Sequence, residues 1–143
     1  FAPLPQNDGK WKPDDLEFIT KGIEAARAAY AIDATRIVAA GEQTGGTAAF
    51  ALAFKARDAV RGAVLINCPL AGRLSDNEPL RPLAIYLATA KSVPYAGAVG
   101  KAVTKLREMK YPVVEQPLGD MPRELTDDER AALGRWLDAL DQI

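Results

Sequence analysis

The sequence predicts an α/β domain of three layers, α/β/α, with a mainly parallel sheet of about four strands. Short apolar runs, typical of strands buried on both faces, alternate with longer segments whose apolar residues recur at helical spacing. The segments follow one another as helix, strand, helix, strand, loop, strand, helix, strand and helix. This alternation favours parallel strands that are joined by right-handed crossovers.

Four segments have the pattern of helices. Asp14 or Asp15 can cap the first, and Thr126 with Glu129 forms a capping box at the start of the last. The acidic run 127–129 complements the dipole of that last helix. The expected helices are 14–30, 47–56, 96–109 and 126–140.

Four shorter apolar segments have the pattern of strands. Residues 63–66 are continuously apolar, which fits a strand covered by helices on both faces. Residues 111–116 are more polar, so we expect that strand at an edge of the sheet. The expected strands are 37–40, 59–67, 83–89 and 111–116.

The 143 residues are expected to form one domain, 14–143, after a linker, 1–13, that is rich in proline. The chain begins Phe-Ala-Pro rather than with methionine, so we expect it to be a piece of a longer polypeptide. The remainder of that polypeptide, or another protein, is its expected partner.

The composition excludes several kinds of site. The chain contains no histidine, so neither a Ser-His-Asp relay nor a histidine metal site can be built within it. Its single cysteine, Cys68, excludes an intrachain disulfide and a multi-cysteine zinc site, and we expect it to be buried. We expect no metal and no cofactor.

The charge is balanced, with 18 basic and 19 acidic residues. This balance indicates neither a basic face for nucleic acid nor an acidic tail. No apolar run reaches the ~18–20 residues of a membrane span, and the start shows no signal-peptide pattern. We therefore expect no nucleic-acid binding and no membrane span in this segment.

The stretch 36–54 holds the main candidate site. A short apolar strand, a turn bounded by Gly41 and Gly45, and an apolar helix form the context of a nucleophile elbow. Glycines suit this turn because side chains there would collide with the neighbouring strand and helix. The centre of the turn is Gln43, whose amide is no nucleophile. The sequence thus predicts an elbow without its reactive residue.

Gln43 has two interpretations, a hydrogen-bonding cap on the turn or a contact to a ligand. The backbone N–H groups of Thr44 and Gly45 open a helix and could hold an anion, although Glu42 beside them weakens that attraction. With Asp120 from a later loop, Gln43, Thr44 and Gly45 are the candidate ligand contacts.

The stretch 14–54 resembles the middle of an esterase-type α/β-hydrolase, and the later segments follow the order of that family. The residues that carry the resemblance are Tyr30, Ile32, Asp33, Arg36, Ile37 and the elbow 41–46. The resemblance implies a partial α/β-hydrolase fold, its C-terminal half, without the early strands and their oxyanion loop.

The resemblance also implies where a catalytic triad would stand. The nucleophile position falls on Gln43, the acid position on Lys91 and the histidine position on Met121, so the chain resembles a degenerate hydrolase. Lys91 and Asp120 could meet above the sheet as an ion pair that replaces the lost contact; otherwise they are separate loop charges.

A second likeness rests on the order of the segments and on the glutamine in the elbow. The chain is similar to esterase-like C-terminal domains of some bacterial trypsin-like serine protease–PDZ proteins, which implies a periplasmic location; otherwise we expect a cytoplasmic one. Three functions remain open: a non-catalytic binding or scaffolding domain, an esterase or peptidase completed by residues outside this chain, and a small-molecule sensor that uses the old cleft. We favour the first.

The strand 37–40 is expected at an edge of the sheet, because the strands beside it in the whole fold are absent. An uncovered edge exposes backbone N–H and C=O groups next to apolar side chains. We expect the segment 1–11, or a second copy of the chain in a homodimer, to cover it. Residues 1–3 would be the remnant of an earlier strand.

Overall fold

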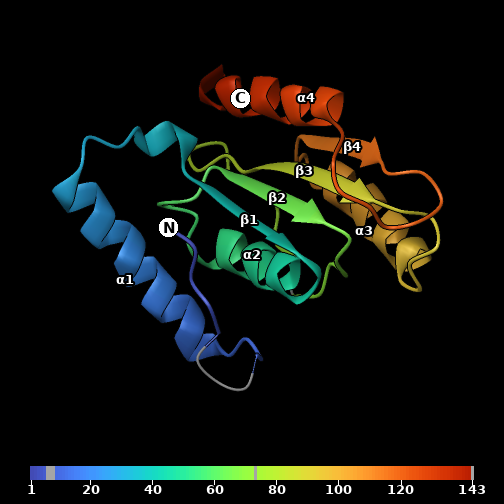
Figure 1. Ribbon diagram of the computed structural model, residues 1–143. Coiled ribbons are helices and arrows are strands. Elements are labelled where there is room, and N and C mark those ends of the chain that lie inside the picture. The colour runs from blue at the N-terminus through green and yellow to red at the C-terminus, as the bar shows by residue number, and fades with distance from the viewer. Residues whose placement is uncertain (6–8, 73, 143) are drawn as a thin grey trace.

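The computed structural model describes residues 1–5, 9–72 and 74–142, and in these ranges it forms one four-stranded parallel sheet with helices on both faces (Figure 1). The predicted α/β class and parallel sheet are confirmed. The strands, in spatial order, are β1 Val38–Glu42, β2 Gly62–Ile66, β3 Ala84–Thr89 and β4 Val113–Pro117. The helices are α1 Pro13–Ala29, α2 Gln43–Lys55, α3 Ala96–Glu108 and α4 Asp127–Asp138, with 3₁₀ turns η1 Ala34–Arg36 and η2 Leu140–Gln142.

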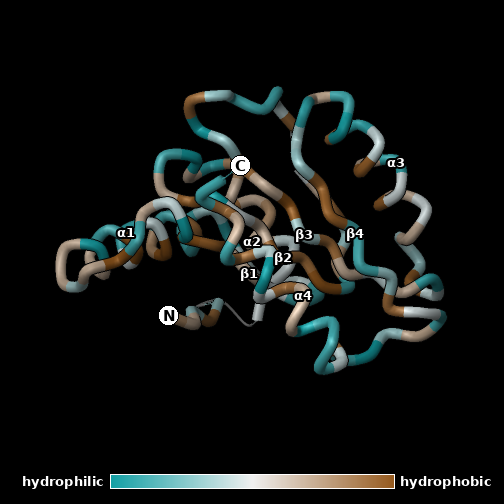
Figure 2. The backbone as a smooth tube through the Cα atoms, turned by 90° about the horizontal axis from the view of Figure 1, so that it is seen from above, coloured by the Kyte–Doolittle hydropathy of each residue, from teal (hydrophilic) through white to brown (hydrophobic). Residues whose placement is uncertain are grey.

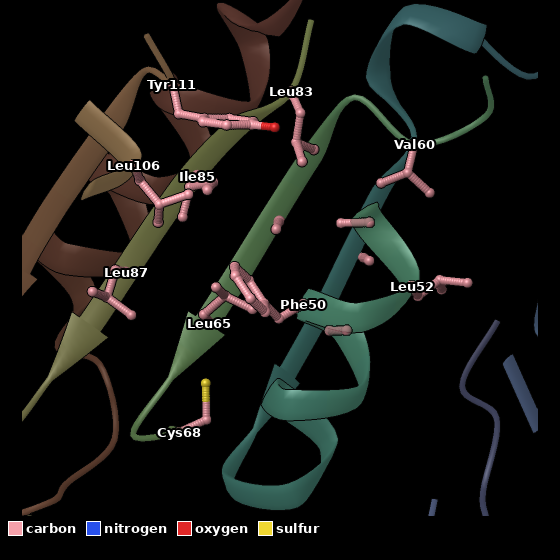
Figure 3. Close-up of a cluster of buried hydrophobic side chains, with 14 of the residues drawn as sticks. Phe50, Leu52, Val60, Leu65, Cys68, Leu83, Ile85, Leu87, Leu106 and Tyr111 are labelled. Carbon is pink, nitrogen blue, oxygen red and sulfur yellow. The ribbon is translucent and has the colours of Figure 1, made fainter. Parts of the chain in front are cut away.

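The two faces of the sheet are covered by different helices. Figure 1 shows α4 above the sheet and α2 and α3 below it, with α1 beside α2. Successive strand residues point to opposite faces, so Leu65 packs with Phe50 and Leu106 below the sheet (Figure 3). Above the sheet, the ring of Tyr86 lies 5.5 Å from that of Trp136. Seen from above, the apolar strands occupy the middle of the molecule (Figure 2).

Both predicted edge strands lie at edges in the described part of the chain, because β1 pairs only with β2 and β4 only with β3. Pro117 closes β4, which suits an edge strand because proline has no N–H to donate. The expected cover of β1 by the N-terminal segment is incomplete. Phe1–Pro3 form no strand there, and they line one side of a groove beside β1.

The expected boundaries around the elbow are wrong. The strand continues to Glu42 instead of ending at Ala40, and the helix begins at Gln43 instead of Thr47. No loop separates the two elements, because a single left-handed residue, Gln43, turns the chain. The apolar pattern begins only at Thr47, since the glycines before it carry no hydropathy signal.

The first helix also begins earlier than expected, at Pro13, with Lys12 as its N-cap. Proline suits the first position of a helix because an N–H there would have no hydrogen-bond partner within the helix. The carboxylate of Asp15 accepts a hydrogen bond from the Lys12 N–H at 2.8 Å. The proposed linker therefore loses one residue to the helix, and its residues 6–8 lie outside the described ranges. The other boundaries agree to within a few residues.

A buried arginine, Arg57, fastens the long connection between β2 and β3. Its guanidinium donates to the hydroxyl of Tyr111 and to the side-chain oxygen of Asn77, both at 2.8 Å. It also donates to the carbonyl of Arg81. Arg57 is only 5% exposed, and a buried cation without hydrogen bonds would destabilise the fold. These hydrogen bonds compensate the guanidinium for its lost contact with water.

The predicted capping box at the start of α4 is confirmed. The Glu129 N–H donates to the hydroxyl of Thr126 at 3.3 Å, and the Thr126 N–H donates to the Glu129 carboxylate at 2.8 Å. Arg123 donates to both oxygens of that carboxylate, each at 2.7 Å. The hydrogen bonds from Arg123, and then that from Thr126, lower the pKa of Glu129 from 4.5 to about 2.

We expect the replacement Glu129→Gln to lower stability at pH 7 but not at pH 2. A carboxylate whose pKa is lowered by folding stabilises the fold above its unfolded value of 4.5, and this contribution is lost as the pH falls to about 2. Urea unfolding at both pH values measures it, with Asp128→Asn as the control on the same turn. A difference between Glu129→Gln and the parent sequence that is unchanged at pH 2 would refute this coupling.

Candidate functional site

The elbow predicted from the sequence is a direct passage from β1 into α2. Gln43 has a φ of 51°, in the left-handed region that costs a side-chain-bearing residue about 1–3 kcal/mol. Its side chain is exposed, and no hydrogen bond of that side chain occurs within the described ranges. The interpretation of Gln43 as a hydrogen-bonding cap therefore has no support, and its amide is free to face a partner.

Two glycines make this passage possible. A Cβ on Gly41 would lie 2.3 Å from the carbonyl of Gly45, and a Cβ on Gly46 would lie 2.6 Å from the sulfur of Cys68. Both distances are far below any real contact. The backbone of β1 therefore lies directly against the first turn of α2, and the side chain of Cys68 lies directly against the backbone of Gly46. A Cβ on Gly45 would meet nothing within 4 Å, so the expected steric role belongs to Gly41 and Gly46 and not to Gly45.

The positions that the resemblance implies for the acid and the histidine lie in adjoining loops. Because the strands are parallel, these loops follow the carboxyl ends of β3 and β4, at the same end of the sheet as the elbow. The Lys91 N–H donates to the carbonyl of Gly119 at 3.0 Å, and the Ser92 N–H donates to the carbonyl of Asp120 at 2.9 Å. The ammonium of Lys91 lies 3.5 Å from the carboxylate of Asp120, so the ion pair considered from the sequence is present. Met121, at the histidine position, is 68% exposed.

The structure does not join Gln43 to this pair. In the described part of the chain, no hydrogen bond or ion pair links Gln43 with Lys91 or Asp120, and β2 lies between the strands that carry them. Both members of the ion pair are largely exposed, so water and salt screen their attraction. The backbone bonds between the loops hold this part of the site together.

Sequence reasoning missed Asn67, which stands at the end of β2 between the elbow and the ion pair. It is 2% exposed with a φ of 41°, and its side-chain oxygen accepts the Ala90 N–H at 3.0 Å. Its carbonyl accepts a hydrogen bond from the hydroxyl of Tyr95. The one available signal was a polar residue that ends a continuously apolar strand. Asn67 therefore fixes the loop after β3 against the end of β2.

Cys68 is fully buried, as expected, and burial raises the pKa of its thiol to about 11. It is therefore a neutral packing group under Gly46 and no thiolate nucleophile. Within the described ranges, no cluster of three or more histidine, cysteine, aspartate or glutamate residues could hold a metal ion. Among the helices described, none combines the length and apolar character that a membrane span requires.

No family model and no curated protein matches the sequence. The fold, in contrast, matches solved esterases. A Bacillus cereus carboxylesterase is 24% identical with a TM-score of 0.67, over 94% of this chain and 66% of its own. An esterase from Rhizomucor miehei is 19% identical with a TM-score of 0.66, over 96% of this chain and 61% of its own.

The chain has an esterase-like α/β fold. A phospholipase/carboxylesterase from Dyadobacter fermentans gives the same result, with 19% identity and a TM-score of 0.64 over 86% of this chain and 61% of its own. The chain thus spans less than two thirds of the length of these three proteins. At such low identity the likeness concerns the fold, so the chemistry of this esterase-like chain depends on its own residues.

We expect Gly41→Ala to destabilise the fold by more than about 2 kcal/mol, because its methyl group would overlap the backbone of α2. Gly45→Ala is the matched control in the same turn. Its methyl group meets open space, and alanine is favoured over glycine in a helix by about 1 kcal/mol. Urea unfolding of both variants measures the difference, and equal effects would contradict the elbow packing.

Proposed function

We propose that this chain is a non-catalytic, esterase-like domain that serves as a binding or scaffolding module of a larger protein. The observation that carries the proposal is Gln43, which occupies the left-handed centre of the elbow. An amide neither attacks an ester nor is activated by a base. The sequence also contains no histidine that could take up a proton near neutral pH.

The polar groups at the carboxyl end of the sheet, around the elbow, suit binding better than hydrolysis. Gln43 and Thr44 are exposed at the start of α2, where unpaired backbone N–H groups also favour an acceptor. Lys91 and Asp120 add one exposed charge of each sign. The carboxyl end of the sheet therefore offers hydrogen-bond donors, acceptors and charges to a polar partner surface. The proposed contacts are Gln43, Thr44, Gly45 and Asp120.

We further propose that the larger protein is a serine protease–PDZ protein, on the basis of the resemblance in sequence alone. The sequence encoded upstream of Phe1 tests this parentage. A trypsin-like triad followed by a PDZ segment is expected there. An uninterrupted N-terminal half of an esterase would overturn the parentage and favour the alternative below.

The alternative is an esterase or peptidase completed by segments outside this chain. It is favoured by one observation: at least a third of each solved esterase described above lies outside the part that this chain covers. Such segments could in principle supply a base. They could not turn Gln43 into a nucleophile, which is why we place this alternative second.

Neither the chain nor Gln43→Ser is expected to hydrolyse p-nitrophenyl butyrate above the rate of a Gln43→Ala control. A serine hydroxyl without a neighbouring base stays protonated at neutral pH, and each missing triad member removes a separate step. Release of p-nitrophenol and the intact mass of each protein measure turnover and acylation.

Two results would contradict the proposal. Turnover by the original chain that is lost in Gln43→Ala would show that the amide takes part in catalysis. A burst of p-nitrophenol with an acylated Gln43→Ser protein would show that a base is already in place at the elbow.

A further inference from the structure

A cavity of about 180 Å³ lies between β4 and the first turns of α3, at the side of the sheet away from β1 (Figure 1). Part of its lining is apolar. Leu87 of β3 and Val99 of α3 line it, and both belong to the core that packs below the sheet. Gly100 of α3 also lines it, and a Cβ there would meet nothing within 4 Å. In the described part of the chain, no residue of the elbow 42–46 lines this cavity.

Thr89, which also lines the cavity, carries a buried hydroxyl that forms no hydrogen bond within the described ranges. Thr89 lies two residues beyond Leu87 on β3, so its side chain points to the same face of the sheet, toward α3. A buried hydroxyl without a hydrogen bond destabilises a fold. A polar atom brought into the cavity could complete this hydrogen bond after a rotation of the threonine side chain.

The charges around the cavity favour an anion. Glu115 lines it, but its carboxylate already pairs with Arg107 at 2.7 Å. Lys91 lines it as well, and its ammonium lies 3.5 Å from the carboxylate of Asp120, with both side chains largely exposed. An exposed ion pair of this length contributes little, so the ammonium can turn to another carboxylate at small cost.

The beginning of α3 adds to this preference. Ala96, the first residue of the helix, lines the cavity, and the first turn contains neither an acidic residue nor a side-chain cap. The N-terminus of a helix attracts negative charge. This helix end borders the same cavity as the ammonium of Lys91 and the side chain of Thr89, so three features favour an anion at one place.

The volume and the apolar lining limit what can enter. In another protein, an apolar cavity of about 150 Å³ holds benzene. A space of about 180 Å³ therefore admits a molecule little larger than benzene. Such a molecule needs an apolar part for Leu87 and Val99 and an anionic part for Lys91.

We propose that this cavity binds a small carboxylate with a short apolar tail, such as butyrate. The carboxylate contacts the ammonium of Lys91 and the hydroxyl of Thr89, and the tail lies against Leu87 and Val99. The inference goes beyond the proposed function, since a module that binds a polar partner at the elbow needs no such ligand. Ester hydrolysis does not report on this cavity, so either proposal can fail without the other.

Titration of the isotope-labelled chain with sodium butyrate, followed by NMR, tests the proposal. The amide signals of Lys91, Gly100 and Gln116, which all line the cavity, should shift along one saturable curve. Butanol lacks the charge and acetate lacks the tail, so each should bind at least about fivefold more weakly. Signals that do not shift, or that shift equally with all three solutes at equal ionic strength, would overturn the proposal.

Gly100→Leu places a side chain in the cavity and should abolish the shifts that butyrate causes. Gly97→Leu is the matched control on the same helix. A Cβ at Gly97 also meets nothing within 4 Å, and Gly97 is not among the lining residues in the described part of the chain. Binding that survives Gly100→Leu, or that both variants lose alike, would overturn the proposal.

Two charge variants test the contact with the carboxylate. Lys91→Gln should weaken butyrate binding at least about fivefold. Lys101→Gln, the same change at an exposed position of α3, should not weaken it. Asp120→Asn should strengthen binding, because it frees Lys91 from its ion pair. Equal affinities of the two lysine variants, or weaker binding by Asp120→Asn, would overturn the assignment of the carboxylate to Lys91.

Thr89→Val replaces the unpartnered hydroxyl with a methyl group of similar size. The variant without ligand should melt at a higher temperature than the parent chain, because no buried hydroxyl is left without a hydrogen bond. It should also bind butyrate more weakly, an effect that a purely structural role of the hydroxyl does not produce. An unchanged affinity for butyrate would overturn the contact with Thr89.

Discussion

At the elbow, the backbone of β1 touches the first turn of α2 with no side chain between them. Gly41 and Gly46 allow this contact, and Cys68 closes it from the end of β2. The requirement is set by glycines and packing, so it does not depend on the side chain at position 43. The left-handed turn can therefore persist with a glutamine at its centre.

The loops that would carry the rest of a triad are likewise held by interactions other than triad chemistry. Backbone hydrogen bonds join Lys91 to Gly119 and Ser92 to Asp120, and Asn67 ties the start of the first loop to β2. The ion pair between Lys91 and Asp120 is exposed to solvent and only adds to these backbone bonds. The backbone framework of these loops thus does not depend on an acid or a histidine at these positions.

Sequence alone predicted the elements that produce a local pattern. The buried strand at 63–66 and the capping box of Thr126 and Glu129 were found because apolar runs and cap residues act over a few positions. The start of α2 was missed because glycines carry neither a hydropathy nor a helix signal. Arg57 and Asn67 were missed because their partners lie far along the chain, and only the fold brings them together.

The open edge of β1 shows the same division between local and distant information. Its place at the edge could be inferred from the resemblance, which left neighbouring strands outside the chain. The groove beside β1 depends on how α1 and Phe1–Pro3 lie along that strand. No periodicity in the sequence could reveal that arrangement.

Labelling of the full-length protein with a fluorophosphonate, followed by mass-spectrometric mapping of the modified residue, tests most directly whether this esterase-like fold lacks a hydrolytic centre. The reagent phosphonylates a hydroxyl that a neighbouring base has activated. We predict that residues 1–143 carry no adduct, whatever is modified elsewhere. An adduct on Thr44 at the elbow, or on Ser92 beside Lys91, would show an activated nucleophile at the carboxyl end of the sheet. Such an adduct would contradict a non-catalytic role.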